Sequence, residues 1–244
     1  MERITVIKDN LPHFGLFTRN TVQGKEYDMI QEFISFYSHQ FLRSNKKNNL
    51  AIFIEPRVAS GFPDVVFASY SPSITDNWSE QRSDINTDDL KVLSHLILAS
   101  QSTGERLIAQ LGLTKGQAGK SLNKLLNANL ITYKNKIWKP KKLNSIFNIK
   151  KLVSLEAKIN DTSRVIEQSF INTWFASHSY ALTRAESPRD KTLLTFSGLG
   201  LGLYCRSQRS HSFREVVEPT PLPLPSSYQS LLFNEWIGNM LTSK

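Results

Sequence analysis

The first third of the chain has two kinds of hydrophobic pattern, one typical of a helix and one typical of strands. Residues 25–43 predict an amphipathic helix, because aromatic and aliphatic side chains recur every three or four positions. Two strand-like runs follow, Leu50–Glu55 and Pro63–Ala68, with turn-forming residues between them. We therefore expect a helix followed by a β-hairpin. Residues 72–88 are rich in Ser, Asp, Asn and Pro, which is typical of a linker.

The middle of the chain has a second, mostly helical pattern. Residues 88–100 and 103–113 predict two helices, the second of them short and ended by a glycine. Thr114 is a suitable N-cap for a third helix over residues 115–129, and residues 130–140 predict a two-stranded hairpin. Three helices followed by a two-stranded wing form a pattern similar to that of winged-helix domains.

The last part of the chain returns to alternating strands and helices. Residues 151–157 predict a strand, residues 163–176 a helix and residues 179–183 another strand. A glycine-rich strand pair is expected around residues 198–204, and a last short helix over residues 231–240. The first and last parts together predict an α/β core with a mixed central sheet flanked by helices.

The positive charge of the protein is concentrated in the middle segment. The formal net charge is +9, and residues 88–150 contain eleven Lys and Arg against three Asp and Glu. The rest of the chain is almost neutral. A local excess of this kind indicates a surface that binds a polyanion. The alternative is a lysine-rich surface that serves only solubility.

Cysteine content and hydropathy limit the cellular setting. Cys205 is the single cysteine, which excludes an intramolecular disulfide and a cysteine-based zinc cluster. No run approaches the ~18 apolar residues that a membrane span needs, and the residues after Met1 lack the apolar core of a signal peptide. We therefore expect a cytoplasmic protein that does not insert into a membrane.

Two short motifs provide the candidate chemistry. Asp64 follows Pro63 at the start of one predicted strand, and Glu156 and Lys158 alternate on another. Metal-assisted hydrolysis of a phosphodiester needs carboxylates to hold a divalent ion and a basic group near the attacking water. Because side chains alternate along a strand, Glu156 and Lys158 should share one face. Ala157 should point to the other face, with its carbonyl available as a further metal ligand.

These motifs resemble the PD-(D/E)xK nuclease superfamily of restriction and repair enzymes. Pro63-Asp64 matches the first half of the family motif and Glu156-Ala157-Lys158 the second half. The resemblance implies that Asp64 and Glu156 bind Mg²⁺ (or Mn²⁺) and that Lys158 acts on the water. It also implies an additional acid on the first helix, for which Glu26 is the best match and Glu32 a weaker one.

The resemblance extends to the helix after the catalytic strand, with one departure. Some family members have a Gln-x-x-x-Tyr motif there, and Gln168 fits its first position, although Asn172 replaces the tyrosine. The gap of 92 positions between Asp64 and Glu156 is much longer than is usual in the family. The predicted winged-helix segment accounts for it. We therefore expect a restriction-endonuclease-like core in two parts, 1–84 and 149–244, interrupted by a winged helix-turn-helix insert at 85–148.

The third helix of the insert has the residue types of a DNA-recognition helix. Its amides suit base edges, and its lysines, with those at the tip of the wing, suit phosphates. The predicted DNA-binding residues are Lys115, Gln117, Lys120, Asn123, Lys124, Lys134 and Lys136. Leucines on the opposite side would face the core. A basic helical domain for protein–protein contact is the alternative.

The sequence therefore predicts a metal-dependent endonuclease that acts on double-stranded DNA. Restriction, phage defence and mobile-element processing are compatible settings by analogy alone. The alternative is a non-catalytic DNA-binding regulator or assembly subunit whose nuclease-like part is only a scaffold. The sequence does not discriminate DNA from RNA as substrate, and it leaves open whether the protein forms a homodimer.

Overall fold

The computed structural model describes residues 3–8, 10–19, 23–207 and 212–242, and its chain folds into two compact units. Each unit is assembled from three separate segments of the chain. The first unit contains residues 1–10, 17–71 and 149–226, and the second contains residues 11–16, 72–148 and 227–244.

The first unit is built on a mixed sheet of seven strands, in the order β1-β2-β3-β7-β8-β9-β10. β3 is antiparallel to both its neighbours, β2 and β7, whereas β7, β8 and β9 run parallel. β1 is parallel to β2, and β10 is antiparallel to β9. The strands are β1 (Ile4–Ile7), β2 (Asn49–Ile54), β3 (Val65–Tyr70), β7 (Ile149–Lys158), β8 (His178–Thr183), β9 (Gly202–Arg206) and β10 (Phe213–Val217).

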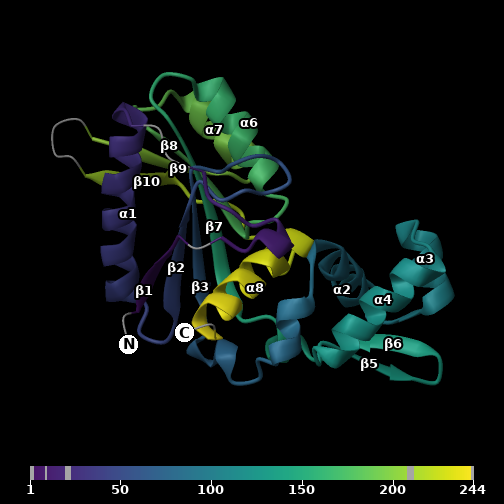
Figure 1. Cartoon of the computed structure of the whole chain (residues 1–244). Helices are drawn as coiled ribbons and strands as arrows, with labels where there is room; N and C mark the ends of the chain where they lie inside the picture. Colours follow the sequence, from purple (N-terminus) through teal and green to yellow (C-terminus); the bar gives the residue numbers. More distant parts are fainter. Residues whose placement is uncertain (1–2, 9, 20–22, 208–211, 243–244) are drawn as a thin grey trace. The chain divides into compact units, whose positions relative to one another are not determined.

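Helix α1 (Lys25–Ser44) covers one face of this sheet, and helices α6 (Thr162–Asn172) and α7 (Asp190–Gly198) cover the other (Figure 1). The apolar stripe of α1 packs against alternate residues of the central strands, with Phe33 and Phe67 at its centre. On the other face, Val165 and Phe196 pack against β8 and β9. The central strands are therefore buried on both sides, which explains why β2 and β3 are nearly continuous apolar runs.

The second unit is mainly helical and has a small three-stranded sheet of its own, in the order β4-β6-β5. Its helices are η1 (Pro12–Phe14), η2 (Pro72–Thr75), η3 (Glu80–Asp84), α2 (Thr87–Ala99), α3 (Gly104–Leu111), α4 (Lys115–Asn127), α5 (Leu143–Ile146) and α8 (Tyr228–Thr242). Its strands are β4 (Ser102–Thr103), β5 (Ile131–Lys134) and β6 (Ile137–Pro140). None of the described helices is long and apolar enough to cross a membrane.

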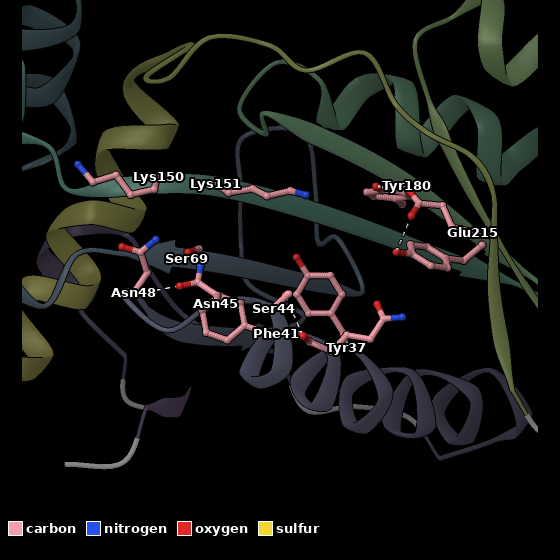
Figure 2. Close-up of a pocket in the computed structure, with 12 residues that line it drawn as sticks. Tyr37, Phe41, Ser44, Asn45, Asn48, Ser69, Lys150, Lys151, Tyr180 and Glu215 are labelled. Carbon is pink, nitrogen blue, oxygen red and sulfur yellow. Dashed lines mark hydrogen bonds between the residues drawn. The ribbon is translucent and has the colours of Figure 1, made fainter.

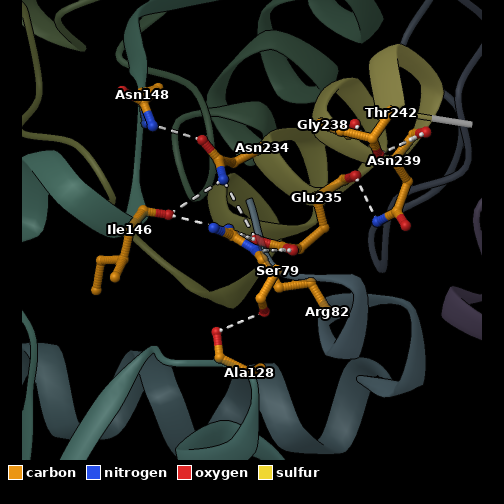
Figure 3. Close-up of polar contacts among 10 residues, drawn as sticks. All are labelled: Ser79, Arg82, Ala128, Ile146, Asn148, Asn234, Glu235, Gly238, Asn239 and Thr242. Carbon is orange, nitrogen blue, oxygen red and sulfur yellow. Dashed lines mark hydrogen bonds and ion pairs between the residues drawn. The ribbon is translucent and has the colours of Figure 1, made fainter. Parts of the chain in front are cut away.

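A buried ion pair lies at the centre of the second unit (Figure 3). The guanidinium of Arg82 pairs with the carboxylate of Glu235 on α8, and both side chains are almost fully buried. Arg82 also donates to the carbonyl of Ile146 at 3.2 Å and lies over the ring of Trp78, with Cζ 3.7 Å from the ring centroid. Asn234 accepts from the backbone N–H of Asn148 at 2.8 Å. These contacts hold α8 against residues 78–148 of the same unit.

The α8 contacts correct two predictions from the sequence. Residues 227–244 belong to the second unit, not to the α/β unit, and so do residues 72–84. The segment 72–88 is not a linker, because it forms η2 and η3 and buries Ile74 and Arg82. This polar segment includes Arg82, whose charge is neutralised by the distant Glu235.

The predicted glycine-rich strand pair is confirmed only in part. Residues 190–198 form helix α7, and Gly200 adopts a left-handed conformation in the turn that follows, with φ of 68°. Only residues 202–206 form a strand there, and this strand pairs with β8 and β10. The other predicted helices and strands are present, with ends that differ by a few residues.

The central ion pair gives a prediction for stability. Arg82→Ala should lower the free energy of unfolding by about 3–5 kcal/mol, because it leaves the charge of Glu235 buried and unpaired. Chemical denaturation of the full chain measures this change. Lys91→Ala is the matched control, since its pair with Asp88 is exposed and should contribute at most about 1 kcal/mol. An equal loss of stability in the two variants would contradict the prediction, because the buried pair would then contribute no more than the exposed one.

Candidate active site

The pairing of β3 with β7 brings the two predicted metal-binding carboxylates together. Val65 lies opposite Leu155 in this antiparallel ladder, so Asp64 and Glu156 occupy the next pair of positions along it. A carboxylate oxygen of Asp64 accepts the backbone N–H of Ala157 at 2.7 Å. The two strands are therefore neighbours, although 92 positions separate the two acids in the sequence.

Glu156 is buried against helix α6. Its side chain is 3% exposed, and one of its oxygens accepts a hydrogen bond from the side-chain amide of Asn172 at 2.8 Å. The other oxygen is buried and has no hydrogen-bond partner among the described residues. An unsatisfied buried carboxylate oxygen is costly, which makes this atom a candidate ligand for a cation.

Burial raises the pKa values of both acids. Burial, reinforced by the charge of Asp64, raises the pKa of Glu156 to about 8. Burial also raises the pKa of Asp64, against the hydrogen bond from Ala157 and the positive charge of Lys158, which lower it. Neighbouring carboxylates that resist ionising together are typical of sites that hold a divalent cation or a shared proton.

Lys158 is held beside these acids by two neighbours. Its ammonium group donates to the carbonyl of Ala157 at 2.8 Å and lies 3.4 Å from a carboxylate oxygen of Glu26, at the start of α1. The second oxygen of Glu26 accepts the backbone N–H of Ile159 at 3.3 Å. Glu26 therefore lies next to Lys158, and the Ala157 carbonyl that we predicted as a metal ligand accepts a hydrogen bond from Lys158. The weaker candidate, Glu32, pairs with Arg206 instead.

Helix α6 contributes one residue, Asn172, whose role at the site the sequence did not indicate. Asn172, which replaces the expected tyrosine, makes the hydrogen bond to Glu156 described above. Gln168 lies one turn earlier on the same helix, and its side-chain oxygen is buried with no hydrogen-bond partner among the described residues. The spacing of four positions between them was the available signal, because it puts both amides on one face of the helix.

The residues present fit a small, hard cation. Mg²⁺ is commonly held by one or two carboxylates, with water and substrate phosphates completing its shell. Asp64 and Glu156 supply two carboxylates, and one oxygen of Glu156 has no other partner among the described residues. The structure describes no group of three or more His, Cys, Asp or Glu side chains close enough to hold an ion, so the donor set here is limited to this pair and nearby carbonyls.

A cavity lies at the end of the β3–β7 ladder opposite the candidate active site, next to the C-terminal half of α1 (Figure 2). Its volume is about 320 Å³, and Lys151 and Tyr37 lie along it. The single acid in its lining, Glu215, accepts hydrogen bonds from the hydroxyls of Tyr180 at 2.6 Å and Tyr204 at 3.4 Å. Glu215 is the one acid among the described residues that line this cavity, so the cavity lacks the paired acids of the candidate active site.

The predicted DNA-binding residues of the second unit have three different environments. Lys115, Lys120 and Asn123 are exposed on α4, and Lys134 and Lys136 are exposed at the β5–β6 turn. The other two predicted residues, Gln117 and Lys124, make hydrogen bonds within the unit itself.

Gln117, although exposed, and Lys124 both make contacts within the unit that the sequence did not predict. The side-chain oxygen of Gln117 accepts from the backbone N–H of Thr114 at 2.9 Å, which completes a capping box at the start of α4. The ammonium group of Lys124 donates to the carbonyl of Asp84 at 2.8 Å and lies 3.4 Å from Asp89. Both side chains therefore stabilise the fold, which their position on the predicted helix face did not reveal.

Comparison with protein-family models, with curated proteins and with solved structures finds no match.

The raised pKa of Glu156 predicts how stability depends on pH in the metal-free protein. The folded protein holds a proton on Glu156 up to about pH 8, whereas the unfolded chain releases it near pH 4.5. Stability should therefore fall as pH rises through this window, by up to ~1.4 kcal/mol per pH unit. Glu156→Gln should flatten the dependence, measured by urea denaturation in EDTA. Glu167→Gln, at an exposed position of α6, should keep the wild-type slope. Equal slopes for all three proteins would contradict the burial of a protonated Glu156.

Proposed function

We propose that this protein is a metal-dependent DNA endonuclease, with a restriction-endonuclease-like α/β unit that cleaves and a winged-helix unit that binds the duplex. The observation that carries the proposal is the pairing of Asp64 with Glu156 at the ends of neighbouring strands, with Lys158 two residues further along. The resemblance of these residues to the PD-(D/E)xK motif agrees with this arrangement.

Each residue of the site has a role in the proposed hydrolysis. Asp64 and Glu156 would hold Mg²⁺ or Mn²⁺, whose charge would neutralise the scissile phosphate and make a water molecule a better nucleophile. In the hydrolysis, the oxygen of water bonds to phosphorus and the water gives up a proton to solvent, while the bond to the leaving oxygen breaks and that oxygen takes up a proton. Lys158 orients the attacking water, and Glu26 positions Lys158 through their 3.4 Å contact. Asn172 orients Glu156 by its hydrogen bond.

The second unit supports the DNA-binding half of the proposal. Three helices, α2 to α4, precede the β5–β6 hairpin, and a short β4 completes a three-stranded sheet, which is the order of elements in winged-helix domains. Asn135 and Lys136 form a tight turn at the tip of the hairpin with positive φ angles of 52° and 62°. α4 presents Lys120 and Asn123 to solvent. Exposed lysines on both elements suit contacts to DNA phosphates.

Substitution of the paired acids tests the cleavage. Asp64→Asn and Glu156→Gln preserve shape but remove the charge that holds the ion, so each should lower the rate of plasmid cleavage by at least about a hundredfold. The assay compares Mg²⁺, Mn²⁺ and EDTA. Glu167→Gln, an exposed acid of α6, is the matched control and should cleave as the wild type does. Binding of duplex DNA without cleavage under any metal would instead support a non-catalytic regulator.

Two lysines of α4 provide a matched test of DNA binding. Lys120→Gln should reduce the slope of log affinity against log salt concentration by about 0.9, because one phosphate contact is lost. Lys124→Gln should leave this slope unchanged and lower thermal stability instead, because Lys124 is held by Asp84 and Asp89. Fluorescence anisotropy with a labelled duplex measures the slopes. An unchanged slope for Lys120→Gln would exclude the exposed face of α4 as a phosphate-binding surface.

A further inference from the structure

A cleft of about 630 Å³ adjoins the candidate active site. Its walls are residues 23–27 at the start of α1, residues 159–161 between β7 and α6, and Arg184 after β8. Because β7 and β8 are parallel and Lys158 lies beside Thr183, the chain leaves the sheet at Ile159 and at Arg184 side by side. Glu26, which contacts Lys158, forms part of the same wall, so the cleft is continuous with the proposed cleavage site.

Both acids of this cleft accept hydrogen bonds, whereas one buried nitrogen of its arginine has no hydrogen-bond partner among the described residues. Glu26 contacts Lys158 and the N–H of Ile159, and Asp161 accepts the N–H of Arg164 at 2.9 Å as the N-cap of α6. In contrast, the Nε of Arg184 is buried and has no hydrogen-bond partner among the described residues.

Together with Lys158, which pairs with Glu26, the charged groups described at the cleft are three bases, Lys25, Lys158 and Arg184, against the two acids Glu26 and Asp161, a net charge of +1. Lys25 on the opposite wall is exposed, and no acceptor for its ammonium group is found among the described residues. A guanidinium nitrogen that is removed from water without an acceptor is costly, and an anion in the cleft would satisfy it.

We propose that this cleft binds a phosphodiester that neighbours the scissile one on the same DNA strand. Arg184 is its hydrogen-bond donor, and Lys25 is a second positive charge. This inference rests on the proposed function. A phosphodiester is the anion that fits, because any strand that reaches Lys158 and Glu26 carries its neighbouring phosphates along the same wall. Arginine suits the task, since its planar fork matches two phosphate oxygens and it stays charged at any working pH.

Binding of a short oligonucleotide without cleavage tests the proposal. The probe is a fluorescein-labelled single strand of six nucleotides, titrated by anisotropy in EDTA at several salt concentrations. Arg184→Gln should weaken binding about tenfold and reduce the salt slope by about 0.7, the value for one phosphate contact on a single strand. Lys25→Gln should reduce the slope by a similar amount. Arg43→Gln, an exposed arginine in the last turn of α1 and outside the cleft, should change neither quantity.

Arg184→Lys separates a specific contact from a loss of folding or of charge. It should keep the salt slope but bind more weakly, and its melting temperature should match that of the wild type. An unchanged affinity for Arg184→Gln would overturn the proposal, and so would an equal loss for Arg43→Gln. Because the assay needs no metal, its result is independent of catalysis. If Asp64→Asn leaves cleavage unchanged while Arg184→Gln alone weakens binding, the phosphate site stands and the proposed cleavage mechanism falls.

Discussion

The antiparallel pairing of β3 with β7 is the constraint on which the candidate site depends. The two strands are distant in the chain, and the second unit takes most of its residues from the segment between them. The register that puts Val65 opposite Leu155 also puts Asp64 beside Glu156. A shift by one residue would turn Glu156 away from α6 and into the apolar layer under α1, so the buried side chains on both faces hold this register.

The same pairing concentrates opposed electrostatic effects in a small space. Two carboxylates in a buried site favour protonation, and their pKa values are raised accordingly. Asn172, the N–H of Ala157 and the charge of Lys158 offset part of this penalty. One oxygen of Glu156 still has no partner among the described residues, and so the arrangement is better suited to binding a cation than to stability alone. In the cleft nearby the sign is reversed, because Arg184 has the unsatisfied group there.

The second unit depends on a different long-range contact. Arg82 and Glu235 are 153 positions apart, and their pair joins η3 to α8 within one core. Every residue of α8 from Gln229 to Asn239 is buried, and Gly238 leaves room for the ring of Trp78, with which any Cβ would clash. The helical unit therefore needs the C-terminal segment to close its core, although the middle segment contains its α2–α4 helices and its small sheet.

The sequence by itself determined the local elements and the chemical types at the site. Hydrophobic periodicity identified α1 and α4, and strand alternation with a Pro-Asp and a Glu-x-Lys identified Asp64, Glu156 and Lys158. Only the tertiary structure decided how distant segments pair: Asn172 with Glu156, Glu26 with Lys158, and Arg82 with Glu235. Period and propensity describe the neighbours of a residue along the chain. The partner that satisfies a buried polar group is chosen by packing between segments, which these local patterns do not encode.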